Sequence, residues 1–559
     1  MKPKLKRLFK NCATGILLLV FLIGIVFIKQ RLTPIKPLAV ADYPSINVVD
    51  LGAVGNANFF NPSDNKYYAD KAFKNLSTDS TLAFQKALAT KKQVVVPQGN
   101  FLISGKLEME GHSIRIVGSS TGSKIIITSL NYHNRGKDAY NEAAIINKNF
   151  AFSYNSQTAQ ELVLENLFLE YRRNHSNSPK TLILLGNMGK VEIKNVVFNG
   201  FSSTEQQITN LDFYVACKNV LVDNCKFIND TNSKAGGCIW VRNLTTKKER
   251  ISGNNTENVI IRNSSFRKNS NDEIIAVYSV RGDIFNVDIE NNTFETFGRS
   301  ADLIFNIESS EDPFYGVVQN VNFINNKITI HAFNYFVMKL GNEHTNKNVT
   351  KNVLIANNIM NIQDTANVRN KWVIYQADKV SKDIRITGNT INNVKDNVRV
   401  HGIYCLDTIE NNKLNGYFMQ AVLRGNVINN IISGANVGLS DPYIASGNII
   451  MNVNTGIEIL GGTQHYLYDN LIKTNQNQSH IGTGIAVWDN DNDDPTVYLS
   501  GNFINTSHQN DVACRLMKGN IFLKNNSYKG NGENITTSSK TKMNENAVVP
   551  SLNDIVSMR

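Results

Sequence analysis

The sequence lacks the patterns that mark zinc sites and nucleic-acid-binding surfaces. Its six cysteines include no C-x-x-C pair, which argues against a structural zinc site. Positive charge is concentrated at one end, because residues 1–41 contain eight Lys or Arg and no acidic residue. The rest of the chain carries only +3, the total of +11 less those eight charges. A chain so nearly neutral has no basic patch of the kind that binds nucleic acid, so we expect no nucleic-acid partner.

Long apolar runs are also scarce, and the clearest one, Ala13–Ile28, is wholly apolar or small. At about 1.5 Å per residue it spans about 24 Å, which approaches the ~30 Å of a hydrocarbon core once the flanking lysines snorkel. The basic residues precede it, which directs everything after Ile28 out of the cytoplasm. We therefore predict one uncleaved transmembrane helix at about residues 11–28. The alternative is a signal peptide cleaved at Ala39–Ala41, which would make the protein secreted.

The stretch from Leu162 to Tyr528 repeats one short pattern. It reads VLVDNCKF at Val220–Phe227, VIIRNSSF at Val259–Phe266 and VDIENNTF at Val287–Phe294. Apolar residues alternate with polar ones at period two, which predicts β-strands with one inward face. An Asn, Gly or Asp follows each strand, at intervals of 18–39 residues. A fixed motif at a variable interval predicts a solenoid of stacked coils, which is an all-β parallel β-helix.

The residue that follows each strand is expected to turn the chain. A short amide tolerates the left-handed backbone region and can bond the amide one coil above or below. The positions concerned are Asn166, Asn195, Asn224, Asn263, Asn291, Asn325, Asn357, Gly388, Asn411, Asn429, Gly447, Asp469, Gly501 and Asn525.

Two interpretations of the cysteines remain open. Cys217, Cys225 and Cys238 fall in adjacent coils, so a disulfide among them is one option in an exported protein. The other, which we favour, is that Cys405 and the rest lie in the inward stack as small hydrophobic side chains.

Residues Asn47–Ser119 differ from the repeats and predict a cover for the first coil. Asp79 stands at a helix N-cap position before the helical stretch Ser80–Thr90. The apolar face expected of this helix consists of Leu82, Ala83, Ala87 and Leu88. One short amphipathic helix is enough to cover the exposed first coil of a solenoid.

The same region resembles the N-terminal part of the pectate-lyase-superfamily β-helices, a group that holds polygalacturonases, rhamnogalacturonases, related epimerases and phage tailspikes. The family patterns "GAxGDG", "D-x-T-x-A-x-x-x-A" and "VxxPxGxYxxSGxL" correspond to Gly52–Gly55, Asp79–Ala87 and Val95–Leu107, with "GDG" replaced by Gly55-Asn56-Ala57. After Gly55 the chain departs from the family, with a loop of about twenty extra residues rich in Asn and Tyr. The resemblance implies a right-handed parallel β-helix that acts on a polysaccharide, as a monomer or a homotrimer.

These patterns divide the chain into four parts. Residues 1–41 form the basic segment, membrane anchor and linker, and 42–130 form the cap and first coils. Residues 131–529 form the parallel β-helix. Residues 530–559 are expected to be a loose polar tail, of which Asn546–Met558 could fold back as a small cap.

The resemblance implies an active cleft on the outer face of one parallel sheet, lined by outward side chains of successive coils. The second strand of each unit supplies them. The candidate catalytic residues are Glu308, Asp378, Lys339 and His401, and the candidate substrate-binding residues are Tyr404, Glu458, Trp488 and Arg515.

The candidate roles follow from the expected stacking. Glu308 and Asp378 should lie two coils, or about 10 Å, apart. That separation is near the upper end of the roughly 6.5–9.5 Å of an inverting acid and base. Lys339 between them could contact a sugar carboxylate, while Tyr404 and Trp488 could stack on sugar rings.

An oxygen-rich run at Asp489–Pro495 raises the question of calcium. Asp489, Asp491 and Asp493 are candidate ligands, since carboxylates in loops suit Ca²⁺. The run lacks the Gly and terminal Glu of an EF-hand loop, and a solvated acidic turn is the other interpretation. We expect no required cofactor, with calcium as the option.

The residues support an exported, membrane-anchored carbohydrate-active protein that hydrolyses an acidic or complex polysaccharide. A polysaccharide lyase or C5-epimerase is the alternative among enzymes, with Lys339, Arg515 or His401 as base. The chain has no intact polygalacturonase or epimerase motif, so a non-catalytic module that binds or guides a polysaccharide during export also remains open.

Overall fold

The protein is described from a computed structural model. The chain divides into two units, Met1–Ser45 and Ile46–Arg559, and the second contains the whole fold discussed below. The structure describes residues 44–110, 113–119, 122–128, 143–147, 154–173, 180–202, 209–229, 237–244, 254–268, 273–279, 282–297, 302–309, 316–341, 350–364, 371–394, 399–462, 464–475, 481–489, 494–530 and 532–544. The predicted membrane anchor at 11–28 lies outside these residues. Among the residues that are described, no helix has the length and apolar character needed to cross a membrane.

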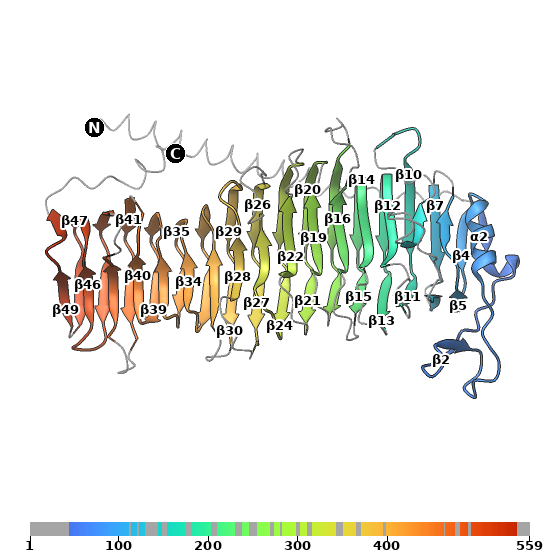
Figure 1. Cartoon of the computed structure of the whole chain (residues 1–559), viewed down its shortest axis with the longest axis horizontal. Coiled ribbons are helices and arrows are strands. Elements are labelled where there is room, and N and C mark those ends of the chain that lie inside the picture. Colours follow the sequence, from blue (N-terminus) through green and yellow to red (C-terminus); the bar gives the residue numbers. More distant parts are fainter. Residues whose placement is uncertain are drawn as a thin grey trace, which may run out of the picture. The chain divides into compact units, whose positions relative to one another are not determined.

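A regular coil of the fold contains three strands, which pair in parallel with their equivalents in neighbouring coils (Figure 1). One coil runs through β17 (Thr256–Arg262), β18 (Ser265–Lys268) and β19 (Ile275–Ser279) before β20 (Ile284–Glu290) begins the next. β17 pairs with β20, and the other two strands pair with their own equivalents one coil on. The predicted parallel β-helix is therefore confirmed. We call the three stacks of strands the first, second and third ladders, in chain order within a coil.

The first ladder holds the strand that precedes each turn. Its members alternate buried and exposed residues, as β20 does with Val287 and Ile289 inward. The remaining members are β1 (Ser45–Asn47), β4 (Gln93–Val96), β7 (Ser113–Gly118), β10 (Gln160–Glu165), the second halves of β12 (Thr181–Lys194) and β14 (Thr209–Asp223), β23 (Val318–Ile324), β26 (Thr350–Ala356), β29 (Lys382–Thr387), β32 (Thr408–Glu410), β35 (Asn426–Ile428), β38 (Ile444–Ser446), β41 (Gln464–Tyr468), β44 (Thr496–Ser500), β47 (Gly519–Lys524) and β50 (Thr541–Asn544).

The second ladder is a sheet of short strands that stacks its inward side chains. Phe198, Phe227, Phe266 and Phe294 lie ring on ring at 4.8 Å, the spacing of the coils themselves. Besides β18 the ladder contains β5 (Gly99–Ile103), β8 (Ser123–Ile127), β11 (Phe168–Arg173), β13 (Val197–Ser202), β15 (Lys226–Asn229), β21 (Thr293–Thr296), β24 (Lys327–Ile330), β27 (Ile359–Ile362), β30 (Thr390–Asn393), β33 (Lys413–Gly416), β36 (Ile431–Ser433), β39 (Ile449–Val453), β42 (Leu471–Thr474), β45 (Phe503–Thr506) and β48 (Ser527–Gly530).

The third ladder follows the longer loops and presents the face on which the candidate site residues were expected. Besides β19 it contains β6 (Leu107–Met109), β9 (Ala143–Asn147), the first halves of β12 and β14, β16 (Ile239–Asn243), β22 (Asp302–Ser309), β25 (Phe336–Leu340), β28 (Lys371–Gln376), β31 (Val400–Tyr404), β34 (Gln420–Leu423), β37 (Val437–Ser440), β40 (Thr455–Ile459), β43 (Thr483–Val487), β46 (Val512–Leu516) and β49 (Glu533–Thr537).

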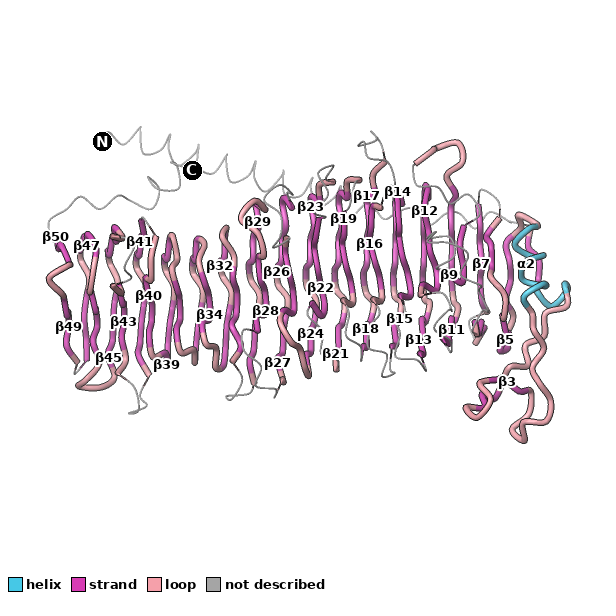
Figure 2. The backbone as a smooth tube through the Cα atoms, viewed as in Figure 1, coloured by secondary structure: helices cyan, strands magenta, loops and turns pink. Residues whose placement is uncertain are grey.

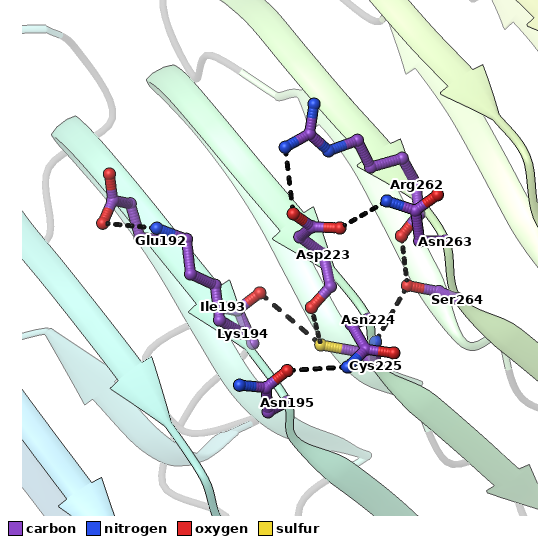
Figure 3. Close-up of polar contacts among 10 residues, drawn as sticks. All are labelled: Glu192, Ile193, Lys194, Asn195, Asp223, Asn224, Cys225, Arg262, Asn263 and Ser264. Atoms are coloured by element: carbon purple, nitrogen blue, oxygen red, sulfur yellow. Dashed lines mark hydrogen bonds and ion pairs between the residues drawn. The ribbon is translucent and has the colours of Figure 1, made fainter. Parts of the chain in front are cut away.

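The turn between the first and second ladders is made as predicted. All fourteen predicted turn positions have a positive φ, between 50° at Asp469 and 68° at Gly501. Exposed amides bond from coil to coil, so that Asn224 Nδ2 donates to Asn195 Oδ1 at 2.7 Å (Figure 3). The left-handed turn is confirmed at every position, and the bond between turn amides is confirmed from Asn166 through Asn195 to Asn224.

From Cys225 onward, the residue after each turn forms a second, buried ladder that the repeats did not reveal. From Asn292 to Asn526, each Asn donates its backbone N–H and its side-chain Nδ2 to the Oδ1 of the next, as Asn358 does to Asn389 at 3.0 and 2.9 Å. In earlier coils Cys225 and Ser264 take this place, with Cys225 N donating to Ser264 Oγ (Figure 3). These side chains satisfy the buried backbone where each coil bends.

The described cysteines are free and buried, which confirms the interpretation we favoured. They are Cys217, Cys225, Cys238, Cys405 and Cys514, and none of the five forms a disulfide. Cys12 lies outside the described residues.

The predicted cap helix is present as α2 (Thr81–Ala89), next to the 3-10 helix η1 (Val48–Leu51) (Figure 2). Its details differ from the prediction in two ways. Ser80 is the N-cap residue, and Asp79 instead accepts hydrogen bonds from the backbone N–H and the hydroxyl of Thr81. Leu82 is 66% exposed, whereas Phe84 is buried with the alanines and packs against Phe101. The buried face of the helix therefore includes Phe84 in place of the predicted Leu82, because the Phe84 ring fills the end of the core.

Two segments expected to be irregular contain strands. The loop after Gly55 forms the antiparallel hairpin β2 (Phe59–Asn61) and β3 (Lys66–Tyr68), whose Tyr67 hydroxyl hydrogen-bonds Glu170 on β11. The tail expected to be loose from residue 530 adds β49 and β50, which pair with β46 and β47. The prediction of a loose tail was wrong for residues 533–544, because their backbone extends the ladders despite a polar sequence.

Candidate functional site

One outward row of the third ladder gathers several candidate residues. The register pairs Lys339 with Tyr375 and Tyr375 with Tyr404. Leu423 and Ser440 continue the row to Glu458. Ala486 then links Glu458 to Arg515. Successive members lie one coil apart, about 4.8 Å. We call this row, from Lys339 to Arg515, the outer row, and within it Ser440 and Ala486 are buried.

The expected acid and base pair is not assembled on this row. The backbone of Glu308 lies opposite Tyr278, and its side chain is outside the described part of the structure. Asp378 follows the end of β28 and is 7% exposed. Its carboxylate accepts hydrogen bonds from the backbone N–H of Ser381 at 2.7 Å and from the Ser381 hydroxyl at 2.9 Å. Asp378 therefore holds a turn, which does not favour its assignment as acid or base.

Aromatic side chains form a cluster beside the start of the outer row. Trp372 stacks on His401 with ring centroids 4.3 Å apart. Phe336 stacks on Tyr375 at 4.6 Å, and Tyr375 on Tyr404 at 5.1 Å. Tyr375 covers one face of the Tyr404 ring, so that face is not available to stack on a sugar.

His401 is held in its neutral form. Burial lowers its pKa to about 4, against a smaller opposing effect of a hydrogen bond with Gln420. A histidine that is neutral at pH 7 cannot act there as a general acid.

Lys339 and Arg515 of the outer row, and Arg424 just after β34, form no ion pair with an acidic residue in the described part of the chain. The Arg424 guanidinium lies 6.0 Å from the Tyr404 ring and that of Arg515 lies 5.7 Å from the Trp488 ring. Elsewhere on the helix, surface cations such as Lys218 and Arg262 pair with carboxylates across adjacent coils. Unpaired positive charge on one face suits a ligand that carries its own negative charge.

The Glu458 carboxyl is partly buried and hydrogen-bonded. It accepts hydrogen bonds from the Ser440 hydroxyl at 2.8 Å and from Gln420 Nε2 at 3.2 Å. Burial raises its pKa, the negative charge of Asp441 raises it further, and the two hydrogen bonds oppose this rise. Asp441 itself accepts the backbone N–H groups of Leu460 and Gly461 on one oxygen. The two carboxyl groups thus sit in different environments on adjacent coils.

The acidic run gives no assembled calcium site in the described residues. Asp489 pairs with Lys540 and lies 3.8 Å from Lys518, which also contacts Asp494. Asp491 and Asp493 lie outside the described residues. No group of three or more His, Cys, Asp or Glu in the described part of the chain could hold a metal ion.

The repeat pattern did not reveal Gln420, Ser440, Asp441 and Arg424. They lie on or just after β34 and β37, where the turn positions are only 18 residues apart. That spacing is itself a signal, since so short a coil leaves room for one third-ladder strand of about four residues.

Three parallel ladders joined into successive coils define a parallel β-helix. No known family and no curated protein sequence matches the chain. Solved structures do resemble it. A surface adhesin of Streptococcus pneumoniae, PfbA, is 14% identical with a TM-score of 0.40, covering 90% of this chain and 100% of that one. The catalytic unit of an alpha-1,3-glucanase from Streptomyces thermodiastaticus is 11% identical with a TM-score of 0.32, covering 82% and 69%. A DFA-IIIase from Arthrobacter chlorophenolicus is 12% identical with a TM-score of 0.39, covering 76% and 94%. Values this low assign no function.

Proposed function

We propose that the outer row binds an acidic polysaccharide and that Glu458 is the proton donor for its hydrolysis. The observation that carries this proposal is the pair of carboxyl groups at Glu458 and Asp441. Burial raises the pKa of Glu458, whereas one oxygen of Asp441 accepts two backbone N–H groups, and two carboxyl groups in different surroundings can divide the acid and base roles of glycoside hydrolysis.

In this proposal Glu458 protonates the glycosidic oxygen as the bond to the sugar breaks. The second oxygen of Asp441 accepts no hydrogen bond from the described residues, so it is available to take a proton from the attacking water. Lys339, Arg424 and Arg515 neutralise carboxylates of the polymer on either side. Tyrosine hydroxyls of the aromatic cluster fix the orientation of neighbouring sugars.

A second candidate is a module that binds the polysaccharide without cleaving it. The observation that favours it is the structural use of the carboxylates: Asp378 holds a turn, and Asp441 accepts two backbone N–H groups. The same cations and hydroxyls would then serve binding alone.

The proposed location is outside the cytoplasm, with the protein held at the membrane. It rests on residues 1–41, where the basic residues precede the apolar run. A signal peptide that is removed remains the alternative.

The test uses the full chain in mild detergent and a panel of uronic-acid-containing polysaccharides. Polymer length and the ultraviolet absorbance of unsaturated ends are followed together. We expect shortening without new absorbance, and loss of at least about 100-fold of this rate in Glu458→Gln, which keeps the size but cannot donate a proton. The matched control is Glu410→Gln, because Glu410 pairs with Arg385 on the first ladder.

The outcomes separate the candidates. If the polymer is shortened and unsaturated, absorbing ends appear, the protein is a lyase and not a hydrolase. If the chain binds the polymer without shortening it, and Glu458→Gln binds equally well, the binding module is supported and the hydrolase is not. Shortening that Glu458→Gln does not slow would remove Glu458 from the proposed role.

A further inference from the structure

Four neighbouring strands of the second ladder carry an apolar side chain on the outward face as well as on the inward one. The register places Ile431 of β36 beside Ile449 of β39, and the outward row continues through Leu471 of β42 to Phe503 of β45 (Figure 2). Ile431 and Phe503 are 37% exposed and Leu471 is 39% exposed, while Ile449 is half-buried. We call these four side chains the apolar stripe.

The strands that carry the stripe have the sequence of a sheet that is covered on both faces. A sheet with one face in water alternates apolar and polar residues, whereas a strand buried on both faces is apolar at successive positions. β36 begins Ile431-Ile432, β39 begins Ile449-Ile450 and β42 begins Leu471-Ile472, and the second residue of each pair is fully buried. A contiguous apolar row left on the surface indicates that a partner covers it.

The charges on the outward face of these strands are positive. Lys413 of β33 precedes Ile431 in the same row, and the adjacent outward row holds Lys473 of β42 and Lys529 of β48. None of these lysines forms an ion pair within the part of the chain that the structure describes. The strands β33, β36, β39, β42, β45 and β48 contain no acidic residue, and the turns that lead into them add one carboxylate, that of Asp469.

We propose that the apolar stripe and its three lysines dock the β-helix on an anionic lipid bilayer. Exposed Ile, Leu and Phe side chains lose contact with water when they enter the boundary between headgroups and acyl chains. Lysines beside them are attracted by the negative surface potential of anionic lipids. The stripe covers three coil spacings, about 14 Å, on the second ladder. The outer row lies on the third ladder, so this contact does not use it.

A second copy of the chain fits this surface less well than a bilayer does. Two copies that met through the stripe would bring their lysines together, and these strands supply no carboxylate to neutralise them. The stripe is also one side chain wide and four coils long, which is small beside the roughly 800 Å² that each partner buries in a stable complex. A bilayer has no such size requirement, because apolar insertion and electrostatic attraction add to each other.

The experiment uses the full chain in a Cys12→Ser background, since the other five cysteines are buried. A thiol-linked fluorophore is placed beside the stripe through Ser433→Cys, or on the exposed face of the first ladder through Lys382→Cys. The protein is reconstituted with vesicles of phosphatidylcholine, alone or mixed equally with phosphatidylglycerol, that contain a spin-labelled lipid as quencher. A local probe is needed because residues 1–41 are expected to hold the chain on a membrane whatever the stripe does.

On the anionic vesicles, we expect the probe at Ser433→Cys to be quenched at least about threefold more than the probe at Lys382→Cys. Replacing the charges through Lys413→Gln, Lys473→Gln and Lys529→Gln should lower this quenching to its value on the neutral vesicles.

The apolar contribution is tested by Ile431→Thr, Leu471→Thr and Phe503→Thr together, because Thr keeps a high strand propensity. We expect this triple substitution to remove the difference between the two probes. The matched control is Ile359→Thr, which should leave the quenching unchanged. Ile359 is 47% exposed on the same ladder, but it lies alone between Lys327 and Thr390 in its row.

Equal quenching of the two probes on anionic vesicles would overturn the proposal, and so would quenching that the triple Thr substitution leaves unchanged. A dimer seen by sedimentation without lipid, and dissociated by the same substitution, would make a second copy the occupant. Protection of the Ser433→Cys probe by a soluble acidic polysaccharide, and not by vesicles, would assign the stripe to the polymer. None of these outcomes depends on whether Glu458 acts in hydrolysis.

Discussion

At the scale of single residues, the position of Glu458 links the proposed chemistry to stability. Burial raises its pKa above the ordinary value near 4.5, so the folded state prefers the protonated form. The stability from this group is fully present below its unfolded pKa and is lost as pH rises through the raised folded pKa. Glu458→Gln removes this dependence, because glutamine stays neutral.

We therefore expect the free energy of unfolding of Glu458→Gln, relative to the original chain, to become more favourable as pH increases above about 4.5. Urea unfolding of both proteins between pH 4 and 8 measures the difference. The proposed hydrolysis should decline over the same pH range, since the proton donor is lost. A stability difference that does not change with pH would mean that Glu458 titrates normally.

At the scale of one structural element, the buried amide ladder should contribute more to the free energy of unfolding than exposed amides do. Asn358 donates to Asn389 Oδ1 and to the carbonyl of Phe323, and it accepts the N–H of Asn326 at 2.8 Å. Asn358→Ala leaves these buried groups without partners, which should cost roughly 2–4 kcal/mol. Asn361→Ala, on the half-exposed face of β27, should cost under about 1 kcal/mol. Chemical denaturation measures both, and equal losses would show that the buried ladder has no special role.

The strands and turns could be predicted because their signals are local. Alternation at period two and a residue that tolerates positive φ act within eight residues of one another, as at Val287–Phe294. The cap helix shows where local signals stop: Leu82 and Phe84 are both apolar, and only the position of the core end selects Phe84. Residues 533–544 carry no apolar alternation, yet pairing with β46 and β47 makes them strands.

At the scale of the whole molecule, the site depends on register between coils that are far apart in sequence. Lys339 and Arg515 share a row because each intervening loop returns the chain to the same place. Loop lengths vary from coil to coil, so counting residues could not show that Asp378 falls beyond the end of β28. Row membership could be predicted for Lys339, Tyr404, Glu458 and Arg515, which follow regular strands, but not for the short coils that supply Gln420 and Ser440.

A stack in which each coil contacts only its neighbours should open from its ends, and the buried cysteines report where it opens. Burial raises the pKa of Cys225, Cys405 and Cys514 to about 12, so none reacts while its coil is intact. Cys514 lies one coil before β49, whereas Cys225 lies far from either end. In a Cys12→Ser background, a thiol reagent in mild urea should modify Cys514 at least about tenfold faster than Cys225. Mass spectrometry of the labelled peptides measures each rate, and one shared rate for all five cysteines would show that the helix unfolds as a single unit.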